Sequence, residues 1–181
     1  MSHQSLHFAE FAEKCKELGV ELVTGKEKTI SQKLTSQVQR SEFVIFAGLP
    51  PAISDRFFAL SGNKCREANK ANLSTIASAQ TCITYSTDLI AGSGSAVIVT
   101  NTLEERQATS LAPELIVFCR NPKVHHNVSD FLAAGRARLS PGTTLTIVSG
   151  PSRTADIEQI LIKGVHGPKI VSVYVEEGAE N

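Results

Sequence analysis

The sequence has no excess of charge of either sign. Lysine and arginine together number 18, and aspartate and glutamate together also number 18. Each half of the chain is close to neutral, so no basic region is masked by an acidic one. Proteins that bind nucleic acid or anionic lipid by general electrostatic attraction carry a clear basic excess. We therefore expect no nucleic-acid partner and no electrostatic attachment to a membrane.

Long apolar runs are also missing. The longest, around residues 43–47 and 115–119, have the length of a strand, whereas a membrane-spanning helix needs about 20 consecutive apolar residues. The first residues, Met1 to Ser5, show neither the basic start nor the apolar stretch of a secretory signal. The sequence therefore predicts no membrane span and a cytoplasmic location.

The cysteines form no pattern that binds a metal or predicts a disulfide. The chain has four of them, scattered as Cys15, Cys65, Cys82 and Cys119. No C-x-x-C pair and no cysteine–histidine cluster of the zinc or iron–sulfur type is present. We predict buried or free thiols without a structural disulfide, and a protein with neither metal nor cofactor.

What the chain does contain is enough apolar sequence for one folded domain. It has 181 residues, of which 41% are hydrophobic and 20% charged, and a typical domain has about 150 residues. The sequence predicts a single domain over residues 1–181, with an N-terminal helix that Gly19 ends. The tail at residues 176–181 is expected to be frayed.

Short apolar or β-branched runs alternate with segments of helical periodicity, which is typical of an α/β fold with a largely parallel sheet. The expected strands are residues 20–24, 43–47, 81–85, 96–100, 115–119, 143–148 and 170–175. The expected helices are residues 6–18, 29–40, 51–60, 64–79, 127–139 and 155–163. Between residues 85 and 96 there is no room for a crossover helix, so an antiparallel pair is expected there and the sheet should be mixed.

The first candidate binding loop follows the strand at residues 81–85. It contains Gly92, Ser93, Gly94 and Ser95. Two glycines allow the backbone to approach a ligand closely, and two hydroxyls can bind phosphate or carboxylate oxygens. The alternative is a glycine-rich turn between two strands with no ligand.

The second candidate loop joins the strand at 143–148 to the helix expected at 155–163. It comprises Ser149, Gly150, Pro151, Ser152, Arg153 and Thr154. With Thr154 as its N-cap, the helix would offer unpaired N–H groups and a positive dipole end beside the guanidinium of Arg153, which suits an oxyanion. The alternative is that Arg153 pairs with Asp156 or Glu158 and the loop is only a connection.

Histidines provide the remaining candidates. His166 stands in the tight loop Gly164-Val165-His166-Gly167-Pro168, where the backbone can hold an imidazole in one pose for acid–base chemistry. A surface or turn-bonding histidine is the alternative. His125 and His126 could recruit a metal, but no acidic or cysteine partner is near in sequence, so a solvated loop is the favoured interpretation.

The segments 149–158 and 164–168, Ser-Gly-Pro-Ser-Arg-Thr-Ala-Asp-Ile-Glu and Gly-Val-His-Gly-Pro, resemble the C-terminal signature of the lactate-utilisation protein C family, which carries the LUD domain. The resemblance extends more loosely over residues 88–119. It implies a mixed α/β sheet flanked by helices, similar to the sugar-phosphate isomerase and coenzyme A transferase superfamily. It also implies that Arg153 lies close to His166 and to the turn that contains Gly92.

The resemblance implies a role in bacterial growth on L-lactate. By this resemblance, the chain would be one of three proteins that together oxidise lactate to pyruvate, and its partners would carry the iron–sulfur centres. The leading hypothesis is therefore a non-redox subunit or accessory protein. A free-standing enzyme and a ligand-binding module are the alternatives, each for a small phosphorylated, carboxylate or coenzyme A-type ligand. A homo-oligomer is compatible with all three.

Two positions depart from the family pattern. The family commonly has Ala-Glu-Thr-Gly where this chain has a glycine at Gly92, and Pro-x-x-His-Ile where this chain has Ile116. A glutamate and a histidine in a shared cleft would serve general acid–base catalysis. Their absence argues against catalysis of that kind and makes the loops around Ser152 and Gly167 the better-supported ligand site.

Overall fold

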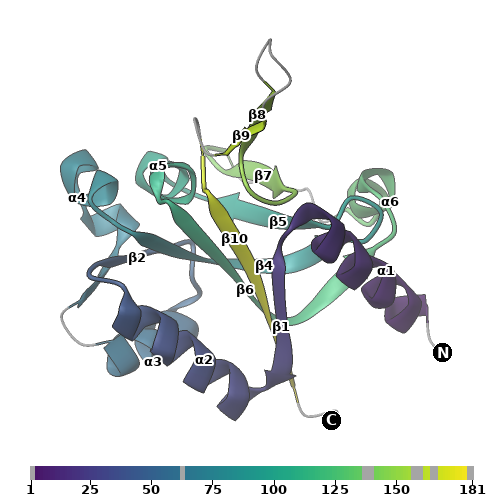
Figure 1. Cartoon of the computed structure of the whole chain (residues 1–181), viewed down its shortest axis with the longest axis horizontal. Coiled ribbons are helices and arrows are strands. Elements are labelled where there is room, and N and C mark those ends of the chain that lie inside the picture. The colour runs from purple at the N-terminus through teal and green to yellow at the C-terminus, as the bar shows by residue number, and fades with distance from the viewer. Residues whose placement is uncertain (1–2, 62–63, 136–140, 156–160, 164–166, 179–181) are drawn as a thin grey trace.

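The structure is a computed structural model that describes residues 3–61, 64–135, 141–155, 161–163 and 167–178. Its centre is an eight-stranded sheet with helices on both faces (Figure 1). Six strands run parallel in the order β1-β10-β6-β4-β2-β3. They are β1 (Glu21–Lys26), β10 (Ile170–Glu177), β6 (Glu114–His125), β4 (Thr81–Ile90), β2 (Val44–Ala47) and β3 (Cys65–Glu67).

Two further strands extend the sheet in the antiparallel sense. β5 (Ser95–Thr100) folds back along β4, and β7 (Thr144–Val148) pairs with the other side of β5. The predicted antiparallel excursion is thus confirmed, and the sheet is mixed but largely parallel.

The apolar runs of the central strands are buried because helices cover both faces of the sheet. All four residues of β2 are buried, as are residues 115–119 of β6. The helical and 3-10 elements are α1 (His3–Leu18), α2 (Glu27–Arg40), α3 (Pro51–Ser61), η2 (Ala68–Lys70), α4 (Leu73–Ala77), α5 (Leu103–Leu111) and α6 (Val128–Ala133). Helices α2 and α3 cover one face, and α1, α4 and α5 contribute to the core on the other. Helix α6 packs Phe131 against β4 and β5.

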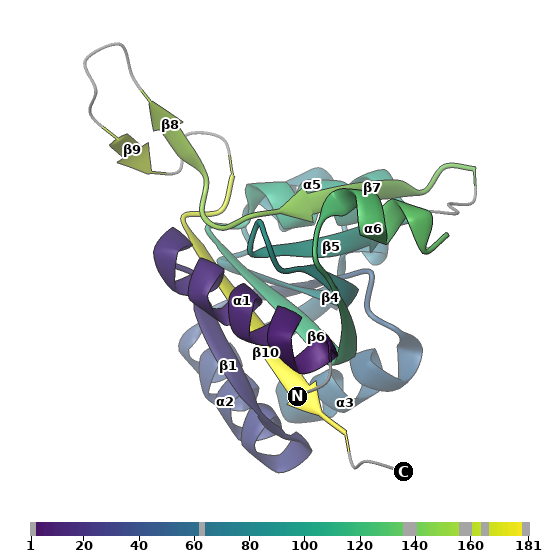
Figure 2. The ribbon, with the colours of Figure 1, turned by 90° about the vertical axis from the view of Figure 1, so that its right-hand side faces the viewer.

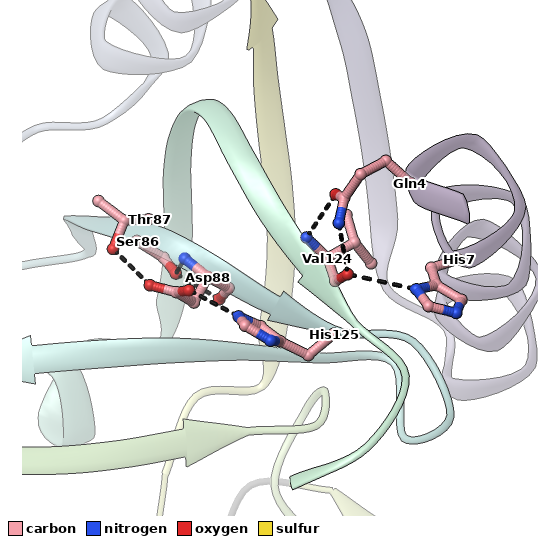
Figure 3. Close-up of polar contacts among 7 residues, drawn as sticks. All are labelled: Gln4, His7, Ser86, Thr87, Asp88, Val124 and His125. Atoms are coloured by element: carbon pink, nitrogen blue, oxygen red, sulfur yellow. Dashed lines mark hydrogen bonds and ion pairs between the residues drawn. The ribbon is translucent and has the colours of Figure 1, made fainter. Parts of the chain in front are cut away.

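The first turn of α1 is tied to the far end of β6 (Figure 3). The side-chain amide of Gln4 accepts a hydrogen bond from the backbone N–H of Val124 at 3.0 Å and donates one to its carbonyl at 3.2 Å. At the other end of the helix, Gly19 adopts φ +73°, a conformation that favours glycine and stops the helix where the sequence predicted. Both ends of α1 are therefore held.

The helix predicted at residues 64–79 is wrong. Cys65 begins the short strand β3, which pairs with β2, and its side chain is buried in the core under α2 and α3. The remaining residues form η2 and the single-turn α4, whose N-cap Asn72 accepts a hydrogen bond from the N–H of Thr75. Pairing with a distant strand overrides a local helical pattern here.

Two other predicted helices differ. In place of the helix expected over 127–139, the structure describes the shorter helix α6 (Val128–Ala133), with Asn127 as its N-cap. Gly135, at φ +68°, follows this helix. The helix expected over 155–163 is wrong where the structure describes it. Instead, β8 (Arg153–Ala155) and β9 (Leu161–Lys163) pair as a separate antiparallel hairpin that stands away from the main sheet (Figure 2).

The prediction of helices missed α5. Its start carries a capping box: the Thr102 hydroxyl accepts a hydrogen bond from the Glu105 N–H, and the Glu105 carboxylate accepts one from the Thr102 N–H. A threonine followed three residues later by a glutamate is a sequence signal for a helix start. That signal was present in the sequence and would have located this helix.

The chain end is also more ordered than predicted. Strand β10 continues to Glu177, and the Glu176 side chain is only 2% exposed. The N–H of Gly178 donates a hydrogen bond to the side chain of Asn121 at 2.6 Å. The frayed tail predicted from residue 176 is therefore wrong for residues 176–178, and residues 179–181 lie outside the described part of the chain.

All four cysteines are buried as free thiols. Burial raises the pKa of the Cys15 thiol to about 12, and it also raises the pKa of Cys82 and Cys119. Because the thiolate is the reactive form, we expect these three thiols to resist an aromatic disulfide reagent at about pH 8 and to react fully once urea unfolds the protein. Stoichiometric modification of any of them in the native protein, followed by absorbance of the released thiolate, would contradict this.

Within the described residues, no helix is long and apolar enough to cross a membrane.

Candidate functional site

The structure brings the two predicted serine loops together. Because β5 and β7 pair with Ala96 opposite Val148, the residues just before β5 and just after β7 are neighbours. The Ser95 hydroxyl lies 2.7 Å from the hydroxyl of Ser93 and 2.7 Å from that of Ser149. Ser95 is fully buried, whereas its two partners are exposed. This serine trio presents hydroxyl groups to solvent that can donate to an oxyanion or accept from a donor.

Glycines set the position of this trio against α1. Gly94 has φ +58°, and a Cβ placed there would lie 2.8 Å from the Cβ of Lys14. Gly150 has φ +107°, and a Cβ placed there would lie 3.2 Å from the Val20 side chain and 3.4 Å from Leu18 Cβ. Both loops can therefore reach the C-terminal end of α1 only because these positions lack side chains.

Arg153 does not stand at a helix N-terminus, because this residue begins β8. Its guanidinium instead donates a hydrogen bond to the carbonyl of Leu18, the last residue of α1. A cation at a helix C-terminus offsets the negative end of the dipole. The sequence predicted the positive end of a helix dipole at this position, which would favour an anion. The structure instead places Arg153 at the negative end of the α1 dipole.

The contact with Leu18 leads to a prediction. Arg153→Ala should lower the free energy of unfolding by about 1 kcal/mol, because an orphan carbonyl of α1 loses its charged donor. Arg153→Lys should keep part of this contribution. Urea unfolding of the three proteins measures it, and an alanine variant as stable as the wild type would show that the contact has no structural weight.

The remaining signature residues are partly outside the described chain. The N–H of Ser152 donates to the carbonyl of Pro168 at 2.8 Å, and Gly167 lies against the Ser152 side chain. The predicted loops 149–153 and 167–168 thus meet, near the amino ends of β1 and β10. Thr154 lies within β8 rather than at an N-cap. His166, the catalytic candidate, lies outside the described residues.

Positions 92 and 116, where the family pattern has an acid and a base, do not share a cleft. Ile116 is fully buried among residues of the core under α2 and α3. Gly92 lies on the side of α1, where an added Cβ would be 3.1 Å from the carbonyl of His126 and 3.7 Å from Glu10. Gly92 is exposed whereas Ile116 is buried, and neither position supplies an acid or a base in this chain.

The structure contains a different imidazole–carboxylate pair. His125 Nε2 lies 2.8 Å from Asp88 Oδ1, and the side chains are 10% and 6% exposed (Figure 3). The ring of Phe131 meets the His125 ring edge to face, with centroids 5.4 Å apart. His126 is exposed and pairs with Glu10 at 3.2 Å. The solvated loop favoured for these two histidines is therefore wrong for His125, which ends β6.

A bulge near the end of β6 creates a second polar region. Ser86 of β4 lies opposite Cys119 and Asp88 opposite Lys123, so three residues of β6 face the single residue Thr87. Within this bulge, Asn121 has φ 45°, the only positive φ of a non-glycine residue in the described chain. Bulges of this kind redirect side chains at the ends of strands, and this one includes Arg120.

Arg120 and Arg56 together hold the buried carboxylate of Glu176. Arg120 Nε donates to Glu176 Oε1 at 2.6 Å, and Arg56 Nη2 donates to Oε2 at 2.7 Å. Arg56 Nη1 also reaches Glu27 at 3.1 Å. The Arg56 guanidinium lies 5.4 Å and 5.7 Å from the ring centroids of Phe57 and Phe118. Both oxygens of one buried carboxylate are thus engaged by arginines from distant parts of the chain.

This ion cluster borders a cleft of about 460 Å³ at the carboxyl ends of β1 and β10 and beside the bulge of β6, at the lower end of the sheet in Figure 1. We call it the sheet-end cleft. It is lined by Lys26, Glu27, Arg120, Glu176, Glu177 and Gly178. In open α/β sheets, ligands bind at the carboxyl ends of the strands. The sequence interpretation missed this region because it treated Glu176 as part of a tail, although the Arg-Asn-Pro triplet at 120–122 was a signal for an interrupted strand.

The charge state of Glu176 follows from its neighbours. Burial alone would raise the pKa of Glu176, but the hydrogen bonds and charges of Arg56 and Arg120 outweigh it and hold the pKa below its ordinary value of 4.5. A carboxyl with a depressed folded-state pKa stabilises the fold above its unfolded-state pKa and loses that contribution as the pH falls through the folded-state pKa.

This sign predicts the pH dependence of stability. The difference in unfolding free energy between wild type and Glu176→Gln should be constant above about pH 5 and should shrink as the pH falls further. Urea midpoints of both proteins, measured from neutral to acid pH, provide the test. A difference that stays constant across the acid range would contradict the ionised state of Glu176.

Comparisons with known proteins agree with the fold. The family model described as the LUD domain matches residues 8–175. A crystal structure of a DUF162 family protein from Deinococcus radiodurans superposes with a TM-score of 0.70 and covers 98% of this chain and 100% of that chain. The two sequences are 15% identical, so this likeness shows the fold alone.

Two curated relatives match over shorter segments. The chain is 38% identical over 71 residues to a Deinococcus radiodurans protein named Lactate utilization protein C, a segment that is 39% of this chain and 34% of the relative. It is 31% identical over 112 residues to Uncharacterized protein YkgG of Escherichia coli K12, which is 59% of this chain and 48% of the relative. The matches therefore span about a third to a half of each relative.

Proposed function

We propose, on the premise that this chain belongs to the LUD domain family, that it is a non-redox subunit or accessory protein of bacterial L-lactate utilisation. The observation that carries the proposal is the family match over residues 8–175, together with the relative named Lactate utilization protein C. The proposal places the protein in the cytoplasm beside iron–sulfur proteins that accept the electrons.

The cysteine environment supports this division of labour. Oxidation of L-lactate to pyruvate releases two electrons and two protons, which a redox centre must accept. Cluster ligands are thiolates, whereas burial raises the pKa of Cys15, Cys82 and Cys119 in this chain. Among the described residues, no group of three or more histidine, cysteine or acidic side chains is arranged to hold a metal. In the proposal, the redox centre belongs to the partner proteins.

The signature loops are the proposed contact with a small anionic ligand. The serine trio of Ser93, Ser95 and Ser149 supplies hydroxyl donors, and the loops around Ser152 and Gly167 are next to it in the fold. A ligand-binding module without turnover is the second candidate function. It is favoured by Gly92 and Ile116, because they leave no acid and no base at the two positions where the family pattern has them.

The test is anaerobic isolation of the tagged full-length protein from cells of its own source grown on L-lactate. We expect iron–sulfur proteins to co-purify, seen as iron and acid-labile sulfide in the eluate, and to oxidise L-lactate only when this chain is present. The same isolation from cells grown without lactate is the control. Lactate-independent turnover of a phosphorylated or thioester substrate by the isolated chain would support a free-standing enzyme and contradict the proposal.

A further inference from the structure

The sheet-end cleft is at the opposite end of the sheet from the signature loops. We propose that it is a binding site for a small organic monocarboxylate, with the guanidinium of Arg120 as the group that receives the carboxylate. This inference stands on the cleft alone and does not depend on the role in lactate utilisation. The cleft volume of about 460 Å³ is within the usual range for small-molecule sites, about 300–1,000 Å³.

Arg120 is held in place and still has donors to offer. Its Nε is used by Glu176, and within the described chain its two terminal nitrogens have no acceptor. Its side chain is 42% exposed and lines the cleft. The terminal N–H groups of a guanidinium match the two oxygens of a carboxylate. Because Glu176 fixes the plane of Arg120, little side-chain freedom would be lost when a ligand binds.

The shape of the main chain around Arg120 is also fixed. The bulge places Asn121 in a conformation that is uncommon for a residue with a side chain, and the Asn121 side chain accepts the N–H of Gly178 at 2.6 Å. This bond ties the end of β10 to the bulge of β6. Strained residues that surrounding contacts hold in place cluster at ligand sites, and here the strain sits beside the proposed receiving group.

The start of α2 adds favourable electrostatics. Lys26, its N-cap, is extended and makes no side-chain cap hydrogen bond, and both Lys26 and Glu27 line the cleft. The first N–H groups of a helix have no intrahelical partner and carry partial positive charge. Glu27, in the first turn of this 14-residue helix, already offsets part of that charge, so the proposal rests on Arg120.

The charges around the cleft disfavour a ligand with two negative charges. Two cations, Lys26 and Arg120, and three anions, Glu27, Glu176 and Glu177, line the cleft. Arg56 is not among the lining residues but pairs with Glu176. Glu176 is neutralised by its two arginines, and the exposed carboxylates of Glu27 and Glu177 would repel a second negative charge. A phosphate dianion or a dicarboxylate is therefore expected to bind less well than a monocarboxylate.

The test uses propionate as the probe and observes backbone amides of the full chain by NMR. Propionate should shift the resonances of Lys26, Glu27, Arg120, Glu177 and Gly178. Propionamide, which has nearly the same size and no charge, should not. Inorganic phosphate should bind these residues more weakly than propionate.

The decisive variant is Arg120→Lys, which keeps the charge and removes the planar fork. It should weaken propionate binding by about tenfold or more. Arg106→Lys is the matched control, because Arg106 lies on α5 and donates to Thr144 instead of lining the cleft. Melting curves confirm that both variants are folded. If Arg120→Lys melts early, Arg120→Gln is used in its place.

Other outcomes overturn the proposal. Equal affinities of Arg120→Lys and Arg106→Lys for propionate would show that Arg120 does not bind the carboxylate. Tighter binding of phosphate than of propionate, or no resonance shift at the cleft at millimolar propionate, would show that the cleft is not a monocarboxylate site. Shifts confined to the serine trio would locate the anion at the signature loops and leave the proposed function standing. Failure of iron–sulfur proteins to co-purify would contradict the proposed function without touching this site.

Discussion

Glu176→Ala is expected to lower the free energy of unfolding by about 3 kcal/mol. The substitution leaves the guanidinium groups of Arg56 and Arg120 without the carboxylate that both of them contact. The larger part of the loss is expected at Arg56, because its side chain is only 18% exposed and its Nε is buried without a partner in the described chain. Urea unfolding measures the loss as a lower midpoint at unchanged slope.

The neighbouring glutamate is the matched control for this experiment. Glu177 is exposed, and Glu177→Ala should change stability by about 0.5 kcal/mol or less. Replacing Arg56 and Glu176 together by Met and Leu should restore part of the loss, since it removes both buried charges. A loss below about 1 kcal/mol for Glu176→Ala would mean that water screens the cluster and that it has the weight of a surface ion pair.

Gly94→Ala is expected to have the second large effect, a loss of about 2–4 kcal/mol. Part of it comes from φ +58°, which favours glycine. The rest comes from the new methyl group, which would lie 2.8 Å from Lys14 Cβ and 3.2 Å from the Lys14 backbone carbon. Because helix backbone cannot move aside as a flexible side chain can, α1 would be displaced from the serine trio.

Gly135→Ala separates these two contributions. Gly135 has a similar φ of +68°, but an added Cβ there meets no atom within 4 Å. It should therefore show only the conformational cost, about 1 kcal/mol. Thermal or urea unfolding of both variants measures the difference. Equal losses at the two glycines would show that the loop and α1 are not in close contact.

The sequence predicts the fold well, but it does not predict the sheet-end cleft. The continuous apolar runs at 43–47 and 115–119 predict buried strands of a parallel sheet, and the short link between residues 85 and 96 predicts the antiparallel excursion. Both are confirmed. These features depend on burial period and on chain length between elements, which are properties of local sequence.

The helix expected over 155–163 shows the limit of that argument. Apolar spacing at three and four residues predicts a helix, but Arg153–Ala155 and Leu161–Lys163 pair as strands. The same limit applies to Cys65, which joins β2 instead of a helix. In both cases a hydrogen-bonded partner elsewhere in space outweighs a local preference worth a fraction of a kilocalorie per residue.

Sequence alone therefore determined the sheet class and the positions of the first helix and of the two glycine–serine loops. The convergence of these loops through β5 and β7 is a feature of the tertiary structure. Only the tertiary structure decided that Gly92 and Ile116 lie on opposite sides of the sheet, and that α1 presents its C-terminal end to Arg153. It alone assembled Arg56, Arg120 and Glu176 into one cluster. The physical reason is that periodicity records which face of an element is buried, whereas the meeting of three distant charges depends on strand order, register and a bulge that no local pattern encodes.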